Sequence, residues 1–378
     1  MFAMRLPSLR DALADVPDFR QAQGRRYDLL PVLLLCCVAV MCGARSQAAI
    51  ADWGRNYGAR WLARLGLRRG RAPSQPTLHR IFKGLDCARL EQCVTRWAEQ
   101  VSRACAVPAL DGLALDGKAL RGSARQGAVE SHLVSALSHR LGMVVAQLGV
   151  PDKSHELGHL DPLLAALALG GRVVTADALH THAEVARAVI ARGGDYLLPV
   201  KANQPVLRQD IALVFAHGKE LADTITSAQT TDCHGDRIET RRLCASTALE
   251  GYLQWPGHAQ VLELRRAVTN KRTSKTRHEI VYGITSLGPE RATPAQLLRL
   301  WREHWHIENR LHYVRDVTFD EDRSQVRAGH APQVMAALRN VAISVLRLCG
   351  AENIAAACRR YAARPALALA AVGIRLRE

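Results

Sequence analysis

The sequence predicts an α/β protein in which helices flank a mixed β-sheet, with a helical N-terminal domain and a β-rich insertion. Residues 1 to 106 carry apolar side chains at helical spacing, whereas from Asp111 short apolar runs alternate with turn residues and then with helical segments. The chain has 378 residues and 48% hydrophobic content, which is enough to bury the cores of two or three domains.

The first domain, residues 1 to 106, contains a long apolar segment between residues 29 and 44. This segment includes Pro31 and is shorter than the roughly 20 residues that a spanning helix needs, so we expect a buried helix. We find no secretory signal. The ten cysteines form no Cys-x-x-Cys pair, which favours buried thiols over disulfides or zinc ligands. We therefore expect a cytoplasmic protein without a membrane partner.

The charge of the chain indicates a polyanionic partner. The formal net charge is +16 and the pI is near 9.9, which favours nucleic acid, with a membrane surface as the rival. Between Asp52 and Asp86 there is no acidic residue, but there are eight cations: Arg55, Arg60, Arg64, Arg68, Arg69, Arg71, Arg80 and Lys83. Aromatic side chains are interleaved with this block, so we favour a DNA-contacting surface that includes Arg68, Arg69 and Arg71 over a solvated face.

The second domain, residues 107 to 378, begins with three sequential strands and continues with helices and strands in alternation. We predict strands at 113–116, 132–138, 143–150, 172–176 and 195–200, and helices at 160–169 and 181–192. Gly142 turns the second and third strands into a hairpin. This order of elements is that of a ribonuclease-H-like core.

Residues 205 to 292 interrupt that alternation. A helix at 206–217 precedes strand-like segments at 238–245, 260–268 and 279–286, which predicts a β-rich insertion over about 218–292. Thr293-Pro294-Ala295-Gln296 is then a capping box that starts a helix. Apolar residues at helical spacing after Gly329 predict one or two further packing helices.

Three carboxylates form the candidate catalytic and metal site. Asp116 and Asp177 each end an apolar strand, where α/β sheets bind ligands, and Glu308 lies on the helix that follows the insertion. Taken singly, Asp116 could be a turn residue and Asp177 a helix cap. Together they offer the oxygen ligands that Mg²⁺ or Mn²⁺ requires, and two such ions can clamp the attacking and leaving oxygens of a phosphoryl transfer.

The segment around Glu308, residues 301 to 323, permits a second interpretation. If it is helical throughout, His304, Glu308, His312 and Arg315 share one stripe, and the first three could hold zinc. That alternative leaves Asp116 and Asp177 unexplained. Four carboxylates follow, Asp316, Asp320, Glu321 and Asp322, and except for Asp316 we interpret them as a solvated turn.

Four cations lie near the carboxylates in sequence and could neutralise DNA phosphates: Lys118, Arg121, Lys201 and Arg315. A solvated surface cation is the alternative interpretation of each one alone.

Several ordered motifs resemble one family across nearly the whole chain. The run His304-Trp305-His306-Ile307-Glu308-Asn309, followed by Leu311-His312-Tyr313, Asp316-Val317, Phe319 and Glu321-Asp322, resembles the signature of bacterial insertion-sequence transposases of the ISAs type, which include the H-repeat-associated proteins. Leu115-Asp116-Gly117-Lys118, Asp177-Ala178 and Asn203-Gln204 occur in the family's order, and residues 1 to 106 resemble its transposase-associated domain.

The resemblance implies a ribonuclease-H-like core whose metal-binding triad is Asp116, Asp177 and Glu308. It further implies metal-dependent strand cleavage and strand transfer at the element ends, and a homodimer on double-stranded DNA associated with the nucleoid. Trp301, His304 and Arg315 stand where related enzymes carry Tyr, Arg and Lys. A catalytically inactive, transposase-derived DNA-binding protein is therefore the alternative.

Overall fold

A computed structural model describes residues 6–23, 25–107, 109–123, 131–150 and 156–374. The chain divides into two compact units, and strand β1 passes from one to the other. The first unit comprises residues 1–108, 117–167 and 306–378, and the second comprises residues 109–116 and 168–305.

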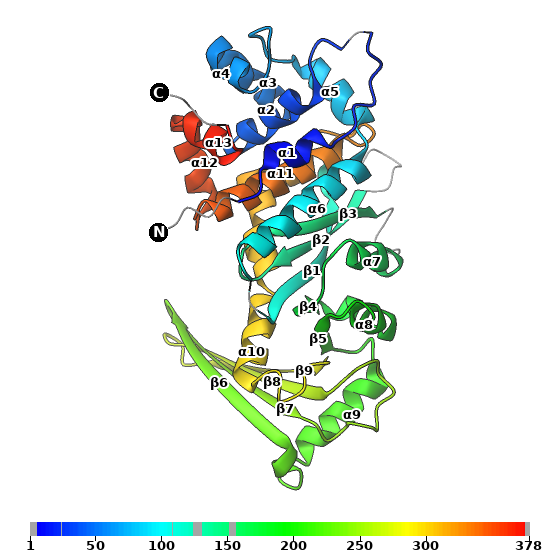
Figure 1. Cartoon of the computed structure of the whole chain (residues 1–378). Coiled ribbons are helices and arrows are strands. Elements are labelled where there is room, and N and C mark those ends of the chain that lie inside the picture. Colours follow the sequence, from blue (N-terminus) through cyan, green and yellow to red (C-terminus); the bar gives the residue numbers. More distant parts are fainter. Residues whose placement is uncertain (1–5, 24, 108, 124–130, 151–155, 375–378) are drawn as a thin grey trace. The chain divides into compact units, whose positions relative to one another are not determined.

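The central feature is a nine-stranded mixed sheet with the strand order β3-β2-β1-β4-β5-β9-β8-β7-β6 (Figure 1). The core strands are β1 (Asp111–Leu120), β2 (Ser131–Ser138), β3 (Val144–Val150), β4 (Arg172–Ala176) and β5 (Asp195–Val200). The β1–β4 and β4–β5 pairs are parallel, whereas β2 and β3 form an antiparallel hairpin. The predicted mixed sheet is confirmed, and Gly142 has a φ of 60° at the predicted hairpin turn.

The insertion extends this same sheet. It contributes β6 (Ile225–His234), β7 (Arg237–Ser246), β8 (Gln260–Asn270) and β9 (Thr276–Thr285), all antiparallel, and β9 pairs with β5. The three predicted strands correspond to β7, β8 and β9. The sequence prediction omitted the edge strand β6, whose residues are all exposed or half-buried and carry no apolar alternation.

Helices α8 (Ala183–Ile190), α9 (Pro205–Ala216) and α10 (Pro294–Glu303) pack on the strands of the second unit. The capping box of α10 is formed as predicted, because Thr293 and Gln296 hydrogen-bond each other's backbone N–H. Trp301 of α10 lies against Gly283 of β9, where an added Cβ would come within 2.5 Å of the indole ring. This close approach seats the helix that leads to Glu308 on the sheet of that unit.

The first unit contains six N-terminal helices, α7 and three C-terminal helices: α1 (Leu9–Ala14), α2 (Leu29–Met41), α3 (Gln47–Asn56), α4 (Gly58–Arg64), α5 (Gln75–Gly84), α6 (Cys87–Ala104), α7 (Glu156–Ala165), α11 (Ala331–Leu348), α12 (Ile354–Ala363) and α13 (Pro365–Ala371). The predicted apolar segment is α2, whose residues are nearly all buried, with α11, α12 and α13 among its contacts. Among the helices that the structure describes, none combines the length and the apolar character that crossing a bilayer requires.

A buried polar cluster joins α6, β3 and α11 within the first unit. Glu91 Oε1 accepts hydrogen bonds from Gln147 Nε2 at 2.7 Å and Gln333 Nε2 at 2.9 Å, and Asn340 Nδ2 donates to Gln147 Oε1 at 2.6 Å. Burial raises the pKa of the Glu91 carboxyl to about 7, against the lowering effect of the two amide donors.

The Glu91 pKa predicts a stability that falls as pH rises. The folded state holds the proton more tightly than the unfolded state, so the ionised carboxyl costs stability progressively above its unfolded pKa. Compared with Glu91→Gln, wild-type protein should lose roughly 2 kcal/mol of unfolding free energy between about pH 5 and about pH 8. Urea denaturation of both proteins measures this difference. If the unfolding free energies of the two proteins changed with pH in parallel, folding would not raise the pKa of Glu91.

Candidate metal centre

Asp116 and Asp177 are placed side by side by two neighbouring strands of the second unit. Leu115 of β1 is in register with Ala176 of β4, and the two aspartates are the next residue along each parallel strand. The strand that carries Asp116 continues to Leu120, so Asp116 lies within β1 and not at its end as the sequence predicts. The sequence correctly predicts that Asp177 follows the last residue of β4.

The carboxylate of Asp177 has a local partner that the sequence did not reveal. Asp177 Oδ1 lies 2.6 Å from His180 Nδ1 and also accepts the His180 backbone N–H at 3.3 Å. Partial burial raises the pKa of Asp177, but the hydrogen bonds and charge of His180 outweigh it, so the pKa lies below its usual value. The spacing of three residues across a short turn was the available signal, since Asp177 caps that turn.

The segment that carries Glu308 is not one continuous α-helix. Helix α10 ends at Glu303, and two π-helical stretches follow at Glu308–His312 and Val314–Thr318. His304 Nδ1 lies 3.1 Å from Thr175 Oγ1 of β4, within the second unit. The continuous helix that a single stripe of His304, Glu308, His312 and Arg315 would require is therefore not formed, because the chain turns at residues 304 and 305.

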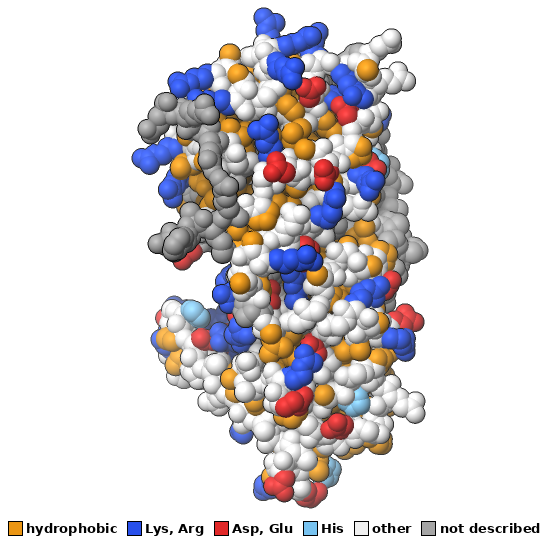
Figure 2. Space-filling model, in the orientation of Figure 1, with side chains coloured by type: hydrophobic (Ala, Val, Ile, Leu, Met, Phe, Trp, Pro, Cys, Tyr) orange, Lys and Arg blue, Asp and Glu red, His pale blue; other side chains and the backbone are white. Residues whose placement is uncertain are grey.

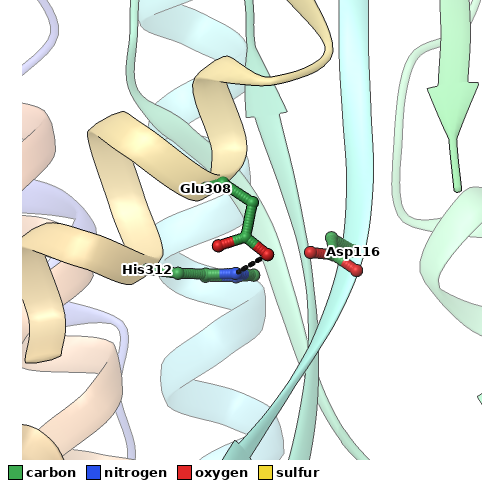
Figure 3. A group of neighbouring side chains, drawn as sticks. All are labelled: Asp116, Glu308 and His312. Atoms are coloured by element: carbon green, nitrogen blue, oxygen red, sulfur yellow. Dashed lines mark ion pairs between the residues drawn. The ribbon is translucent and has the colours of Figure 1, made fainter. Parts of the chain in front are cut away.

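One carboxylate-rich group has the spacing of a metal site. Asp116, Glu308 and His312 each offer one ligand atom, and these atoms all lie within 4.8 Å of one another (Figure 3). Glu308 Oε1 is 3.7 Å from His312 Nδ1 within the first unit. His304 and Asp177 are not members of this group. The one-helix zinc site therefore lacks its first ligand, and His312 is the member that the sequence offered to a metal only in the zinc interpretation.

Two of the predicted DNA-binding cations are engaged in ion pairs within the first unit. Lys118 Nζ lies 2.7 Å from Asp316 Oδ1, and its side chain is only 10% exposed. Arg315 is fully buried, with its guanidinium 2.7 Å from Glu321 Oε2. Arg315 cannot reach DNA from this position, so its predicted DNA contact does not fit the structure.

The buried carboxylate of Glu321 corrects a second prediction. Glu321 Oε1 accepts a hydrogen bond from Arg339 Nη1 at 2.8 Å, and the Glu321 side chain is only 2% exposed. Burial raises the pKa of Glu321, but the charges of Arg315 and Arg339 outweigh it and hold the pKa below its usual value. The residue is therefore a buried ion-pair member and not part of a solvated turn.

The remaining predicted cations are at the surface: Arg68, Arg69, Arg71, Arg121 and Lys201. Arg121 lies 3.8 Å from Asp322 and keeps 74% of its side chain exposed. Figure 2 shows Lys and Arg side chains gathered over the N-terminal helices at the top of the view, where α3 to α5 lie in Figure 1. These residues retain the exposure that a phosphate contact requires.

The fold is that of a ribonuclease-H-like protein, and Asp116, Glu308 and His312 form a candidate divalent-metal centre. The family described as "Transposase DDE domain" matches residues 108–345, and the family "DDE_Tnp_1-associated" matches residues 10–98. The chain belongs to this DDE transposase family.

Two of the relatives are named as putative transposases. The chain is 28% identical over 352 residues to the H repeat-associated putative transposase YhhI of Escherichia coli K12, covering 91% of each chain. It is 29% identical over 360 residues to the putative transposase YncI of Escherichia coli O157:H7, covering 92% of this chain and 89% of the relative. An uncharacterized protein encoded in the dhlA 3′ region of Xanthobacter autotrophicus is 32% identical, covering 68% of this chain and 87% of the relative.

Proposed function

We propose that this protein is the transposase of an insertion sequence and catalyses metal-dependent strand cleavage and strand transfer at the element ends. The observation that carries the proposal is the meeting of Asp116 and Glu308 in one potential metal group in a chain of the DDE transposase family. In the first step the oxygen of a water molecule would bond to the phosphorus of the scissile phosphodiester at the element end. The bond between that phosphorus and the 3′ oxygen would break, and the 3′ oxygen would take a proton. The oxygen of the released 3′-hydroxyl would then bond to a phosphorus of target DNA, and the bond from that phosphorus to the target's own 3′ oxygen would break, which leaves a 3′-hydroxyl on the target.

The donor set fits a divalent cation. Asp116 and Glu308 supply the oxygen ligands that Mg²⁺ and Mn²⁺ prefer, and His312 supplies an imidazole in the same group. We propose that Asp177 completes the triad, because it follows the strand paired with the one that carries Asp116. The contacts described for Asp177 all involve Oδ1, which leaves Oδ2 for a ligand.

The side chains of the centre have distinct roles. Asp116, Asp177 and Glu308 would hold one ion or two, and the bound metal supplies polarisation of the scissile phosphate and stabilisation of the attacking and leaving oxygens. His180 orients the Asp177 carboxylate through the 2.6 Å contact. His312 Nδ1 lies 3.7 Å from Glu308 Oε1 and would offer its imidazole to the same ion.

The DNA partner is proposed from the charge and its distribution. The chain carries a net charge of +16, and the exposed Arg68, Arg69 and Arg71 lie on the N-terminal domain at residues 1–106. Arg121 and Lys201 are exposed and belong to the catalytic domain. We propose that a homodimer holds the two element ends, because one strand-transfer event must join both of them to the target.

Metal removal tests the proposed activity. Purified protein should cleave duplex DNA that carries its element's terminal repeats when Mg²⁺ or Mn²⁺ is present, and cleavage should stop in excess EDTA. The expected cause is loss of charge stabilisation at the phosphate, while binding of the repeats persists. Gel analysis of end-labelled duplexes measures both. Cleavage that continues in EDTA contradicts the proposal, and repeat binding without cleavage in either metal identifies the inactive DNA-binding alternative.

A further inference from the structure

Six charged side chains of the first unit form a charge-balanced cluster beside the segment that carries Glu308. We call it the clamp, and it consists of Lys118, Arg315, Asp316, Glu321, Asp322 and Arg339. Lys118 Nζ lies 2.7 Å from Asp316 and 3.8 Å from Asp322. Glu321 lies between the guanidinium groups of Arg315 and Arg339, at 2.7 Å and 2.8 Å. Three positive and three negative charges thus compensate one another.

The clamp joins three elements that are far apart in the sequence. Lys118 lies on β1, two residues beyond Asp116. Arg315 and Asp316 lie on the second π-helical stretch, which follows the stretch that begins with Glu308 and ends with His312. Arg339 lies on the buried helix α11 and also donates to the backbone carbonyl of Arg45 at 3.2 Å.

The short helical turn Arg121–Ser123, which directly follows β1, lies against the same part of the chain. A Cβ added at Gly122 would lie 2.3 Å from the carbonyl oxygen of Ser324, so only glycine permits this approach. Arg327 Nε donates to the Gly122 carbonyl oxygen at 3.1 Å. These contacts are independent of the ion pairs and hold residues 321–327 against the same end of β1 that carries Lys118.

Such a cluster fixes geometry more than it adds stability. Buried ion pairs lose most of their Coulomb gain to desolvation, but they leave few alternative arrangements once the charges are matched. The π-helix is an uncommon conformation that appears chiefly at functional sites and requires support from its surroundings. The clamp supplies that support at Arg315 and Asp316.

We propose that Lys118 and Glu321 are positioning residues that hold the π-helical segment at residues 308–318 in a fixed position beside strand β1. The proposal rests on the proposed function, because the fixed position of this segment would present Glu308 and His312 to the metal. Lys118 acts through Asp316, and Glu321 acts through Arg315. Neither side chain needs to touch DNA.

A double-mutant cycle on Lys118 and Asp316 tests this role. Lys118→Met and Asp316→Asn should each speed hydrogen exchange in residues 308–318 and weaken Mn²⁺ binding, measured by electron paramagnetic resonance, by about 10-fold or more. The double variant should bind Mn²⁺ as tightly as either single variant and exchange hydrogen no faster, because each single substitution already removes the same contact. Lys118→Arg should restore most of the binding, and Lys219→Met at an exposed lysine is the matched control.

The outcomes separate the proposal from its competitors. Loss of terminal-repeat binding by Lys118→Met, with exchange and Mn²⁺ binding unchanged, would overturn the proposal and return Lys118 to a DNA contact. Effects of the two substitutions that simply add would overturn it as well. If wild-type protein fails to cleave DNA or to bind Mn²⁺, the proposed function fails, but hydrogen exchange in residues 308–318 still decides whether the clamp holds the segment.

Discussion

Glu308→Gln should abolish strand cleavage while leaving the binding of element ends unchanged. The substitution keeps the size of the side chain but removes the charge that a divalent cation requires. Loss of a metal ligand removes several kcal/mol of transition-state stabilisation, which corresponds to a rate decrease on the order of 10³-fold. Single-turnover cleavage of end-labelled duplexes measures the rate, and gel mobility measures the binding.

Asp116→Asn should reproduce the Glu308→Gln defect, because both carboxylates belong to the same group of potential ligands. Glu220→Gln is the matched control, since Glu220 is exposed and lies near none of the candidate ligands in sequence. Cleavage by Glu308→Gln within a few-fold of wild type would remove Glu308 from the catalytic centre. Equal loss of cleavage and DNA binding would point to a folding defect instead.

Glu321→Gln should be the most destabilising single substitution among those considered. The carboxylate is buried between two guanidinium groups, so the variant leaves excess positive charge in the core of the first unit. Breaking a buried ion pair in this way costs about 3–5 kcal/mol. Urea denaturation should show this loss near neutral pH, and Glu250→Gln at an exposed position should show almost none.

The pH dependence of the Glu321→Gln effect gives a further check. The pKa of Glu321 is lowered in the folded protein, so its contribution is present above the unfolded pKa and is lost as pH falls through the folded pKa. The difference between wild type and Glu321→Gln should therefore shrink in acid. A difference below about 1 kcal/mol at neutral pH would show that the ion pairs contribute little net stability.

The sheet was predictable where strands are buried and periodic. β4 and β5 are short apolar runs that the sequence identifies as strands. The predicted end of β4 also gave the correct position of Asp177, directly after the strand. Edge strand β6 was missed because it is half solvated and lacks apolar alternation. Its pairing with β7 comes from backbone hydrogen bonds that any sequence can make, so composition carries little signal for it.

The candidate site was predictable in its carboxylates and not in their surroundings. The acidic run after Asp316 resembles a solvated turn because one of the two partners of Glu321 is Arg339, on a helix 18 residues further along the chain. The helix ends at Glu303, and His304 instead contacts the hydroxyl of Thr175. This end of the helix depends on tertiary packing that helical periodicity does not encode. His180 and His312 likewise acquire their roles only from the folded positions of Asp177 and Glu308.

The most direct test of the central claim is the anomalous scattering of Mn²⁺ in crystals of the protein bound to an element end. We expect a peak within about 2.0–2.3 Å of carboxylate oxygens of both Asp116 and Glu308, with Asp177 or His312 completing the coordination. The same map would decide which of those two is a ligand. An ordered Mn²⁺ ion bound elsewhere on the protein, with Asp116 and Glu308 free of metal, would contradict the assignment.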